Sequence, residues 1–261
     1  MARRQPTGRR RPPARGTAMH MIELPLDAAA LTRFAWHQGH AAKQGYSDED
    51  FGYAAHAWLA ATLGELAPRP FRLQETRRGL RLLGYALQPA QHLAEHARTF
   101  ALPAALAVCD WDTAASKEMP TTWHVGQRLG FEVRACPVSR GERERDLYLV
   151  EVDEAKASGR EPANRSEVYG TWLDRQFGQN EAAKAELITL AGFRRVRSLR
   201  QSRAGQDHRH HGVERPDALF TGELRVLDPD VFASLLARGI GRHRAFGFGM
   251  LLLRPPGRGG T

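Results

Sequence analysis

The order of predicted strands and helices repeats once along the 261 residues, and this repeat constrains the fold more than any other feature. In the first half, apolar alternation and turn residues predict strands at Met19–Leu24, Phe71–Gln74, Leu80–Tyr85 and Leu106–Cys109. Helices are predicted there at Asp27–Gln38, from Ser47 to about Leu63, and at Pro89–Phe100. In the second half, strands are predicted at Leu129–Cys136, Phe193–Leu199, Leu219–Val226 and Met250–Leu253, and helices at Ser166–Phe177 and Pro229–Arg238.

Apart from the additional helix at Asp27–Gln38, each half has the order β-α-β-β-α-β. Two consecutive units of this order predict an α+β fold with two tandem ferredoxin-like, RRM-like domains. We expect the domains at residues 19–115 and 116–261, with a polar segment at 139–160 that could form a helix or strand of its own. Residues 1–18 have little apolar surface to bury, so we expect a disordered, arginine-rich tail.

Positive charge is concentrated at the two ends of the chain. The net charge is +9: residues 1–16 contribute +6, and residues 190–261 contribute +7 from thirteen arginines and six acids, which leaves −4 for the middle. Arginine without lysine in that last stretch favours bidentate contacts with phosphate or guanine. A basic C-terminal third beside an acidic middle therefore indicates a polyanion bound on one face.

Cysteine usage and hydropathy indicate the compartment. Cys109 and Cys136 are too few for a disulfide framework or a metal-ligand cluster, so we expect small buried hydrophobes in a reducing cytoplasm. No apolar run reaches the roughly 18 residues that a membrane helix needs. The sequence therefore predicts a cytoplasmic protein with no membrane partner.

The segment Gly239–Met250, GIGRHRAFGFGM, joins the last predicted helix to the last predicted strand. Its glycines would let backbone N–H groups approach a ligand closely, and its basic residues favour an anion, with phosphate as the first candidate. The order helix–loop–strand excludes a Walker loop and a dinucleotide fingerprint. The alternative is a tight structural turn with solvated arginines. The candidate residues are Gly239, Gly241, Arg242, His243, Arg244, Gly247 and Gly249.

The predicted helix that ends near Leu63 carries a tyrosine–histidine pair beside its apolar face. That face consists of Phe51, Ala55, Trp58, Leu59, Thr62, Leu63 and Leu66. Tyr53 and His56 lie off it and are three residues apart, so they are neighbours. Imidazole can accept or release a proton near neutral pH, and a phenol can stabilise an oxygen that gains charge. We interpret the pair as a candidate proton-transfer site; the alternative is a surface histidine without a role.

Other histidines compete for this role. His92-Leu-Ala-Glu-His96 matches the H-x-x-E-H pattern of zinc proteases, but it needs a third ligand and leaves the basic third of the chain without a purpose. His37 and His40 lie near Trp36 on the additional helix, so His37 is a rival to His56. The histidine-rich run at 207–211 is expected to be a solvated hairpin tip.

Three stretches resemble the CRISPR repeat-RNA endoribonucleases, specifically the CasE branch of type I-E systems. Residues 216–255, PDALFTGELRVLDPDVFASLLARGIGRHRAFGFGMLLLRP, resemble the end of that family with its loop GxGxxxxxGxG. Residues 126–139, GQRLGFEVRACPVS, resemble the strand and loop that open its second domain. Tyr53-Ala-Ala-His56-Ala-Trp-Leu59 matches its Tyr-x-x-His-x-x-Leu helix segment. The resemblance covers most of residues 19–255 and is most specific at the glycine-rich end.

The resemblance implies an RNA hairpin substrate that is cleaved at its base without a metal or other cofactor. It implies attack by the 2′-hydroxyl on the adjacent phosphate, which gives a 2′,3′-cyclic phosphate and a 5′-hydroxyl. His56 would be the general acid/base, and Tyr53 would orient or stabilise. Product retention and assembly into the Cascade surveillance complex are implied as well. The alternative is a non-catalytic subunit of a ribonucleoprotein that binds the RNA hairpin.

Arginines of the second half are the predicted RNA contacts. A-form RNA hides its base edges in a deep major groove, so a stem is recognised mostly through shape and phosphates. An arginine-studded β-hairpin could bind along that groove; the alternative is an edge strand with its arginines in solvent. The predicted contact residues are Arg134, Arg194, Arg195, Arg197, Arg200, Arg203 and Arg209.

Overall fold

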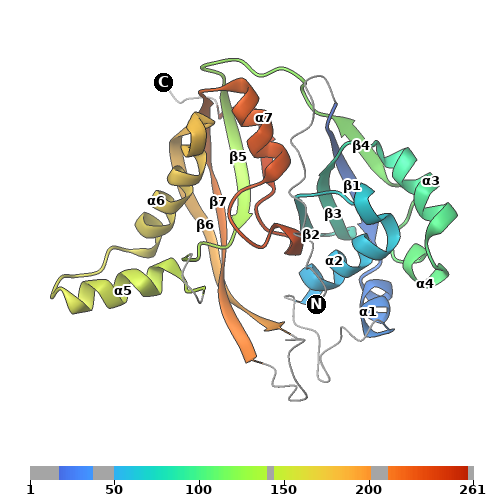
Figure 1. Cartoon of the computed structure of the whole chain (residues 1–261), viewed down its shortest axis with the longest axis horizontal. Coiled ribbons are helices and arrows are strands. Elements are labelled where there is room, and N and C mark those ends of the chain that lie inside the picture. The colour runs from blue at the N-terminus through green and yellow to red at the C-terminus, as the bar shows by residue number, and fades with distance from the viewer. Residues whose placement is uncertain (1–17, 38–49, 140–143, 201–210, 258–261) are drawn as a thin grey trace, which may run out of the picture.

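The computed structural model describes residues 18–37, 50–139, 144–200 and 211–257, and these form two four-stranded antiparallel sheets (Figure 1). The first half consists of β1 (His20–Leu26), α1 (Ala28–His37), α2 (Asp50–Leu63), the 3₁₀ helix η1 (Gly64–Leu66), β2 (Phe71–Thr76), β3 (Gly79–Ala86), α3 (Ala90–Phe100), α4 (Pro103–Leu106) and β4 (Ala115–Glu118). The second consists of β5 (Arg128–Ala135), α5 (Leu147–Ala157), α6 (Arg165–Phe177), η2 (Gln179–Glu181), β6 (Ala183–Arg200), β7 (His211–Val226), α7 (Pro229–Arg238), η3 (Arg244–Phe246) and β8 (Leu251–Arg254).

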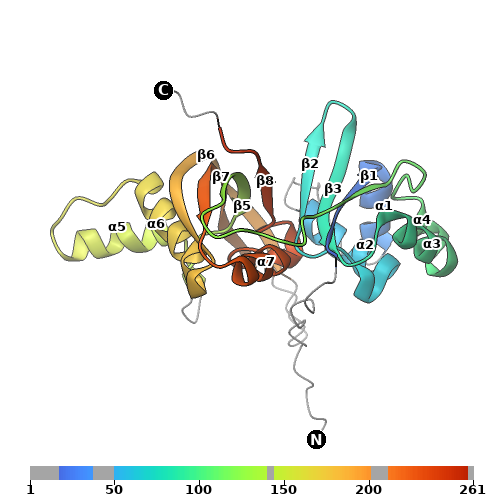
Figure 2. The ribbon, with the colours of Figure 1, turned by 90° about the horizontal axis from the view of Figure 1, so that it is seen from above.

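The first sheet has the strand order β2-β3-β1-β4 and is covered on one face by helices (Figure 2). β1 alternates partly exposed and buried residues, as a strand does when one of its faces lies on the core. Ile22, Leu24 and Leu82 from this sheet are fully buried together with Trp58 of α2 and Leu93 of α3. These contacts fix α2 against the sheet. None of the helices in the described ranges is long and apolar enough to cross a membrane.

The second sheet has the equivalent order β6-β7-β5-β8 and packs against α6 and α7. Its core is aromatic: Phe131 and Phe220 from the sheet are fully buried with Phe177 of α6 and Phe232 of α7. β5 pairs only with the last part of β7, so β6 and β7 continue beyond it as a two-stranded hairpin (Figure 1).

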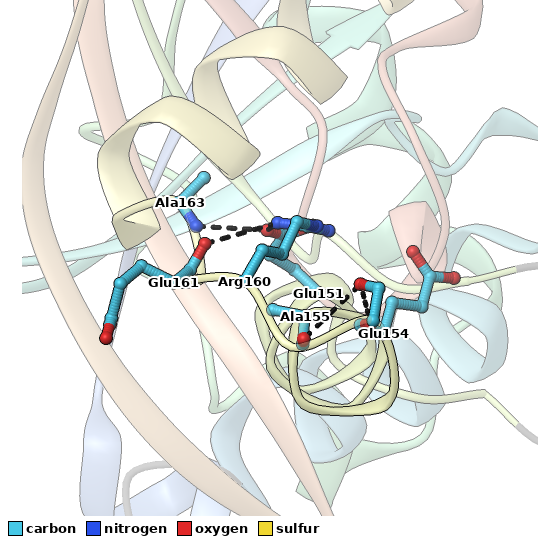
Figure 3. Close-up of polar contacts among 7 residues, drawn as sticks. Glu151, Glu154, Ala155, Arg160, Glu161 and Ala163 are labelled. Carbon is cyan, nitrogen blue, oxygen red and sulfur yellow. Dashed lines mark hydrogen bonds and ion pairs between the residues drawn. The ribbon is translucent and has the colours of Figure 1, made fainter.

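The polar segment at 139–160 contains α5, a helix of its own. The Asp146 side chain caps this helix by accepting a backbone hydrogen bond of 2.8 Å. Glu151, within this helix, accepts hydrogen bonds of 3.0 Å from the Arg160 guanidinium and from the Ala163 N–H, which both lie beyond the end of the helix (Figure 3). These bonds turn the chain back toward α6. The hydrogen bond from Arg160 and that from Ala163 lower the pKa of the Glu151 carboxyl to about 2.

The predicted α+β class is confirmed, and the two sheets are consistent with two ferredoxin-like domains. One predicted strand is wrong: Leu106 ends α4, and Cys109 forms an isolated bridge with Leu26. The fourth strand is β4, whose residues ASKE are all exposed, so no apolar alternation marks it in the sequence. Because β4 crosses the expected boundary between residues 115 and 116, the division into domains stays a prediction. The predicted tail and the Ser47 cap fall outside the described residues, except for residue 18.

The two sheets meet through a separate buried cluster. Leu83 and Tyr85 of β3 pack with Met119 and Met250, on the face of β3 that points away from its helices. The Tyr85 hydroxyl donates a buried hydrogen bond of 2.7 Å to the carbonyl oxygen of Leu251. This bond joins the first sheet to β8 of the second, and burial raises the pKa of the Tyr85 phenol.

We predict that Tyr85→Phe lowers the free energy of unfolding by about 1–2 kcal/mol, because it removes a buried hydrogen bond and leaves a carbonyl acceptor without its donor. Urea denaturation of the whole chain measures this difference. Tyr148→Phe is the control, since the Tyr148 ring stacks on Arg165 and its hydroxyl has no hydrogen-bond partner among the described residues. Equal stability of wild type and Tyr85→Phe would contradict the role of this bond.

Candidate active site

Helix α2 presents Tyr53 and His56 beside its core face. Its buried residues include Ala55, Trp58 and Leu59, and Trp58 Nε1 donates a hydrogen bond of 2.8 Å to the Ala105 carbonyl. These contacts fix the rotation of the helix about its axis. Tyr53 is 40% exposed and His56 is partly buried, so the predicted core face is confirmed and the pair lies next to it.

The segment after α7 folds back on itself through its glycines. Asp228 caps α7 by accepting a 2.9 Å hydrogen bond from Val231 N, and the helix ends at Gly239, whose φ is 74°. Ile240 N donates to the Gly249 carbonyl at 2.8 Å, and Gly249 N donates to the Arg134 carbonyl at 2.7 Å. A Cβ on Gly249 would lie 2.1 Å from the Ile240 oxygen.

In this geometry, the glycines form hydrogen bonds and close backbone contacts within the protein itself. The backbone N–H groups of Gly239 and Gly249 are bound to Leu235 and Arg134 carbonyls, so these two donors are not available to an anion. The positive φ angles, which favour glycine, serve the close approach of the chain to itself. A role of Gly239, Gly241, Gly247 and Gly249 in RNA binding stays a prediction.

Phe246 of η3 connects this segment to the pair on α2. Its ring stacks on Tyr53, with centroids 5.8 Å apart and planes at 14°, and meets His56 edge to face at 5.3 Å and 74°. The backbones also approach closely, because a Cβ on Gly52 of α2 would lie 2.5 Å from the Phe246 carbonyl oxygen. Two segments that are far apart in the sequence therefore meet at one place.

The basic residues of the segment contact acceptors of the protein itself, and their binding of an external anion stays a prediction. Glu144 accepts from Arg242 Nε at 2.8 Å and from His243 Nε2 at 2.7 Å, and Arg215 Nε lies 3.7 Å away. Arg244 donates to the Arg238 carbonyl at 2.8 Å.

His243 also lies near Phe246: the centroids of the two rings are 6.3 Å apart, and the φ of His243 is 60°, in the left-handed region. Burial and the Arg215 charge lower the pKa of the His243 imidazole, although Glu144 opposes the shift. We infer that His243 links the glycine-rich segment to Glu144 and so holds η3 in place.

Arg69 is the charged residue that acts on His56. It is exposed and lies between η1 and β2, where sequence reasoning predicted no site residue. Burial and the charge of Arg69 lower the pKa of the His56 imidazole below its ordinary value of 6.5. The ring is therefore neutral at pH 7 and able to accept a proton.

Two of the predicted RNA-binding arginines form a cluster around one carboxylate. Arg134 Nε donates to Asp217 Oδ1 and Arg194 Nε to Asp217 Oδ2, both at 2.7 Å. Burial alone would raise the pKa of Asp217, but the hydrogen bonds and charges of Arg134 and Arg194 outweigh it and hold the pKa below its usual range. The three residues line a cleft of about 510 Å³ whose walls come from both sheets.

The arginines predicted to form one row on a strand do not all lie on the same face of β6. Arg194 and Arg195 are consecutive in β6, so their side chains point to opposite faces, and Arg195 is exposed. Arg197 and Arg200 belong to β6, but their side chains fall outside the described residues, as do Arg203 and Arg209. Their contacts with RNA stay a prediction.

The competing histidines lie elsewhere. His37 is exposed at the end of α1, and His40 and residues 207–210 fall outside the described part of the chain. His92 is exposed on α3, and the His96 ring packs against Phe100 with centroids 4.8 Å apart. Within the described ranges, no group of three or more His, Cys, Asp or Glu could hold a metal ion.

The site thus consists of a tyrosine, a neutral imidazole, an aromatic ring that orients both, and a nearby arginine. Such an arrangement can move a proton to or from a reacting oxygen and hold negative charge next to it. Sequence reasoning found Tyr53 and His56 but missed Phe246, Arg69 and Glu144. Phe246 had a signal, because it lies within the glycine-rich motif; Arg69 and Glu144 had none.

Comparison with known proteins gives a family and a fold. The family model for "CRISPR associated protein" matches residues 19–255, whereas none of the curated proteins matches the sequence. The structure of CRISPR endoribonuclease Cse3 bound to 19 nt RNA is 20% identical, with a TM-score of 0.61 over 91% of this chain and 100% of that one. Thermus thermophilus Cse3, bound to an RNA representing a pre-cleavage complex, is 18% identical, with a TM-score of 0.57 over 91% of this chain and 100% of that one.

We predict that Gly52→Ala lowers the free energy of unfolding by about 1–3 kcal/mol, because its Cβ would overlap the Phe246 carbonyl oxygen. Gly170→Ala is the matched control: it is also a helical glycine, but the nearest atom to its Cβ, Ile188 Cγ2, would be 3.8 Å away. The control should gain up to about 1 kcal/mol from helix propensity. Urea denaturation compares the two, and equal stabilisation of both would contradict the close contact between α2 and η3.

Proposed function

The chain belongs to the family of CRISPR-associated proteins, and we propose that it is an endoribonuclease that cuts CRISPR precursor RNA at the base of the repeat hairpin. The family match agrees with the resemblance of the three sequence stretches, and the fold is that of Cse3. One observation carries the proposal further: the Tyr53–His56 pair and the glycine-rich segment, which resemble that family independently of each other, contact each other through Phe246.

The reaction that fits this site is an internal transesterification of RNA. The 2′-hydroxyl loses its proton and attacks the adjacent phosphorus; the O2′–P bond forms while the P–O5′ bond breaks, and O5′ takes up a proton. The products are a 2′,3′-cyclic phosphate and a 5′-hydroxyl, and no electron donor or acceptor is needed. Because its imidazole is neutral at pH 7, His56 is suited to accept the proton of the 2′-hydroxyl.

Tyr53 and the arginines have supporting roles in this proposal. The Tyr53 hydroxyl would hydrogen-bond the reacting phosphate or its leaving oxygen, since it lies one turn before His56. Arg195 and the other arginines of the β6–β7 hairpin would bind phosphates of the stem. The same surface would keep the product bound and bring it into a Cascade surveillance complex.

We predict that the protein cleaves its own CRISPR repeat hairpin in excess EDTA and leaves a 2′,3′-cyclic phosphate on the upstream product. Proton transfer by side chains requires no metal, and the described residues offer no ligand cluster. Gel analysis of end-labelled RNA, with acid or phosphatase treatment of the product, measures both outcomes. Cleavage that stops in EDTA and returns with a divalent ion would overturn metal independence, and tight binding without cleavage would favour a non-catalytic RNA-binding subunit.

We predict that His56→Ala slows single-turnover cleavage by at least about a hundredfold, the typical contribution of a general acid or base. The dissociation constant of the hairpin should change only a few-fold, because affinity rests on many arginine–phosphate contacts. Tyr53→Phe should have a smaller effect on the rate, since it removes one hydrogen bond.

His37→Ala is the control for His56→Ala, because His37 is an exposed histidine at the end of α1. It should cleave at the wild-type rate. An inactive His37→Ala variant together with an active His56→Ala variant would move the active site to α1 and overturn the assignment.

A further inference from the structure

Arg69 occupies a rigid position on the backbone. It lies between Pro68 and Pro70, which are both buried while Arg69 is exposed. Arg69 N donates to the Tyr85 carbonyl at 2.7 Å, and Tyr85 N donates to the Pro70 carbonyl at 3.1 Å. The surrounding chain is thus fixed to β3, and only the Arg69 side chain extends into solvent.

The same short segment lies against the glycine-rich segment. A Cβ on Gly239 would lie 3.0 Å from the Cβ and Cγ atoms of Pro70, and a Cβ on Gly247 would lie 3.6 Å from the Phe71 ring. Phe246, beside Gly247, contacts His56. Arg69 therefore extends from the point where the start of β2, the glycine-rich segment and α2 come together.

Arg69 differs from Arg242, Arg72 and Arg194 in having no counter-charge. Arg242 is bound to Glu144, Arg72 to Glu132, and Arg194 to Asp217. Among the described residues, the Arg69 guanidinium donates no hydrogen bond and forms no ion pair. An uncompensated cation beside an imidazole disfavours protonation of that imidazole, so this arrangement suits a site that receives an anion.

We propose that Arg69 is a further catalytic residue, whose guanidinium binds the non-bridging oxygens of the scissile phosphate and stabilises the negative charge that develops on them. This assignment rests on the proposed RNA cleavage. A planar guanidinium with several N–H donors matches two phosphate oxygens at once, and its charge is held in place before the reaction. Arg69 neither donates nor accepts the transferred protons, so the balance of the reaction is unchanged.

The charged surroundings of His56 make a specific test possible. On α2 itself its neighbour is Tyr53. From η3 it contacts the uncharged Phe246, and Arg244 of η3 is bound to the Arg238 carbonyl. Of the described charged groups, Arg69 is the one whose field shifts the pKa of His56. Removing this charge should raise that pKa, and retaining a positive charge should preserve it.

The test compares Arg69→Gln and Arg69→Lys in the full chain with a repeat hairpin RNA. Arg69→Gln should reduce the single-turnover rate roughly 10²-fold, as removal of one charge-stabilising donor does, with the hairpin dissociation constant within a few-fold. The acid limb of its pH–rate profile, and the His56 titration followed by NMR, should move to higher pH. Arg69→Lys should keep the wild-type titration and recover part of the rate.

Arg98→Gln is the control for a lost surface charge, because Arg98 lies on α3 and pairs with the exposed Asp112. It should cleave at the wild-type rate. Wild-type rate and pH profile in Arg69→Gln, with His56→Ala still inactive, would overturn the role of Arg69 and leave the proposed function intact. Wild-type protein that binds the hairpin without cleaving it would overturn the proposed function, and the role of Arg69 with it.

Discussion

The contact of Phe246 with α2 is the interaction on which the candidate site depends. Phe246 comes from the segment that follows α7, whereas Tyr53 and His56 belong to a helix of the first sheet. The rings of Tyr53 and His56 therefore contact Phe246 only when both halves of the chain are packed together. The Tyr85–Leu251 hydrogen bond and the cluster of Leu83, Tyr85, Met119 and Met250 hold the halves in this arrangement. Gly52 matters here because, without a side chain, it lets the backbone of α2 approach the Phe246 carbonyl oxygen.

Two carboxylates each bind two basic residues of the second half of the chain. Glu144 forms an ion pair with Arg242 and a hydrogen bond with His243, and Asp217 accepts hydrogen bonds from Arg134 and Arg194. These ion pairs fix the arginine side chains and reduce the field that these arginines present to an anion. Arg69 and Arg195 are exposed by contrast, and Arg69 acts on the proton equilibrium of His56.

Sequence patterns predicted elements well where one face is buried and poorly where none is. α7 matches its predicted bounds, because Asp228, Pro229 and Gly239 mark its two ends chemically. β4 was missed because its residues are all exposed and its place in the sheet comes from pairing with β1. The predicted strand at Leu106–Cys109 failed for the opposite reason: Val108 and Cys109 are buried, but they follow the short helix α4 and form no strand. Short apolar runs do not distinguish a strand from a helical turn.

By itself, the sequence determined the order of most strands and helices, the core face of α2, and the position of Tyr53 and His56 beside that face. These are local properties, set by periods of 2 and 3.6 residues and by capping residues. Only the tertiary structure decided that Phe246 and Arg69 lie near His56, and that Glu144 binds the basic residues of the glycine-rich segment. These contacts join residues far apart in the chain, and their partners are chosen by how the two sheets pack, which no local pattern encodes.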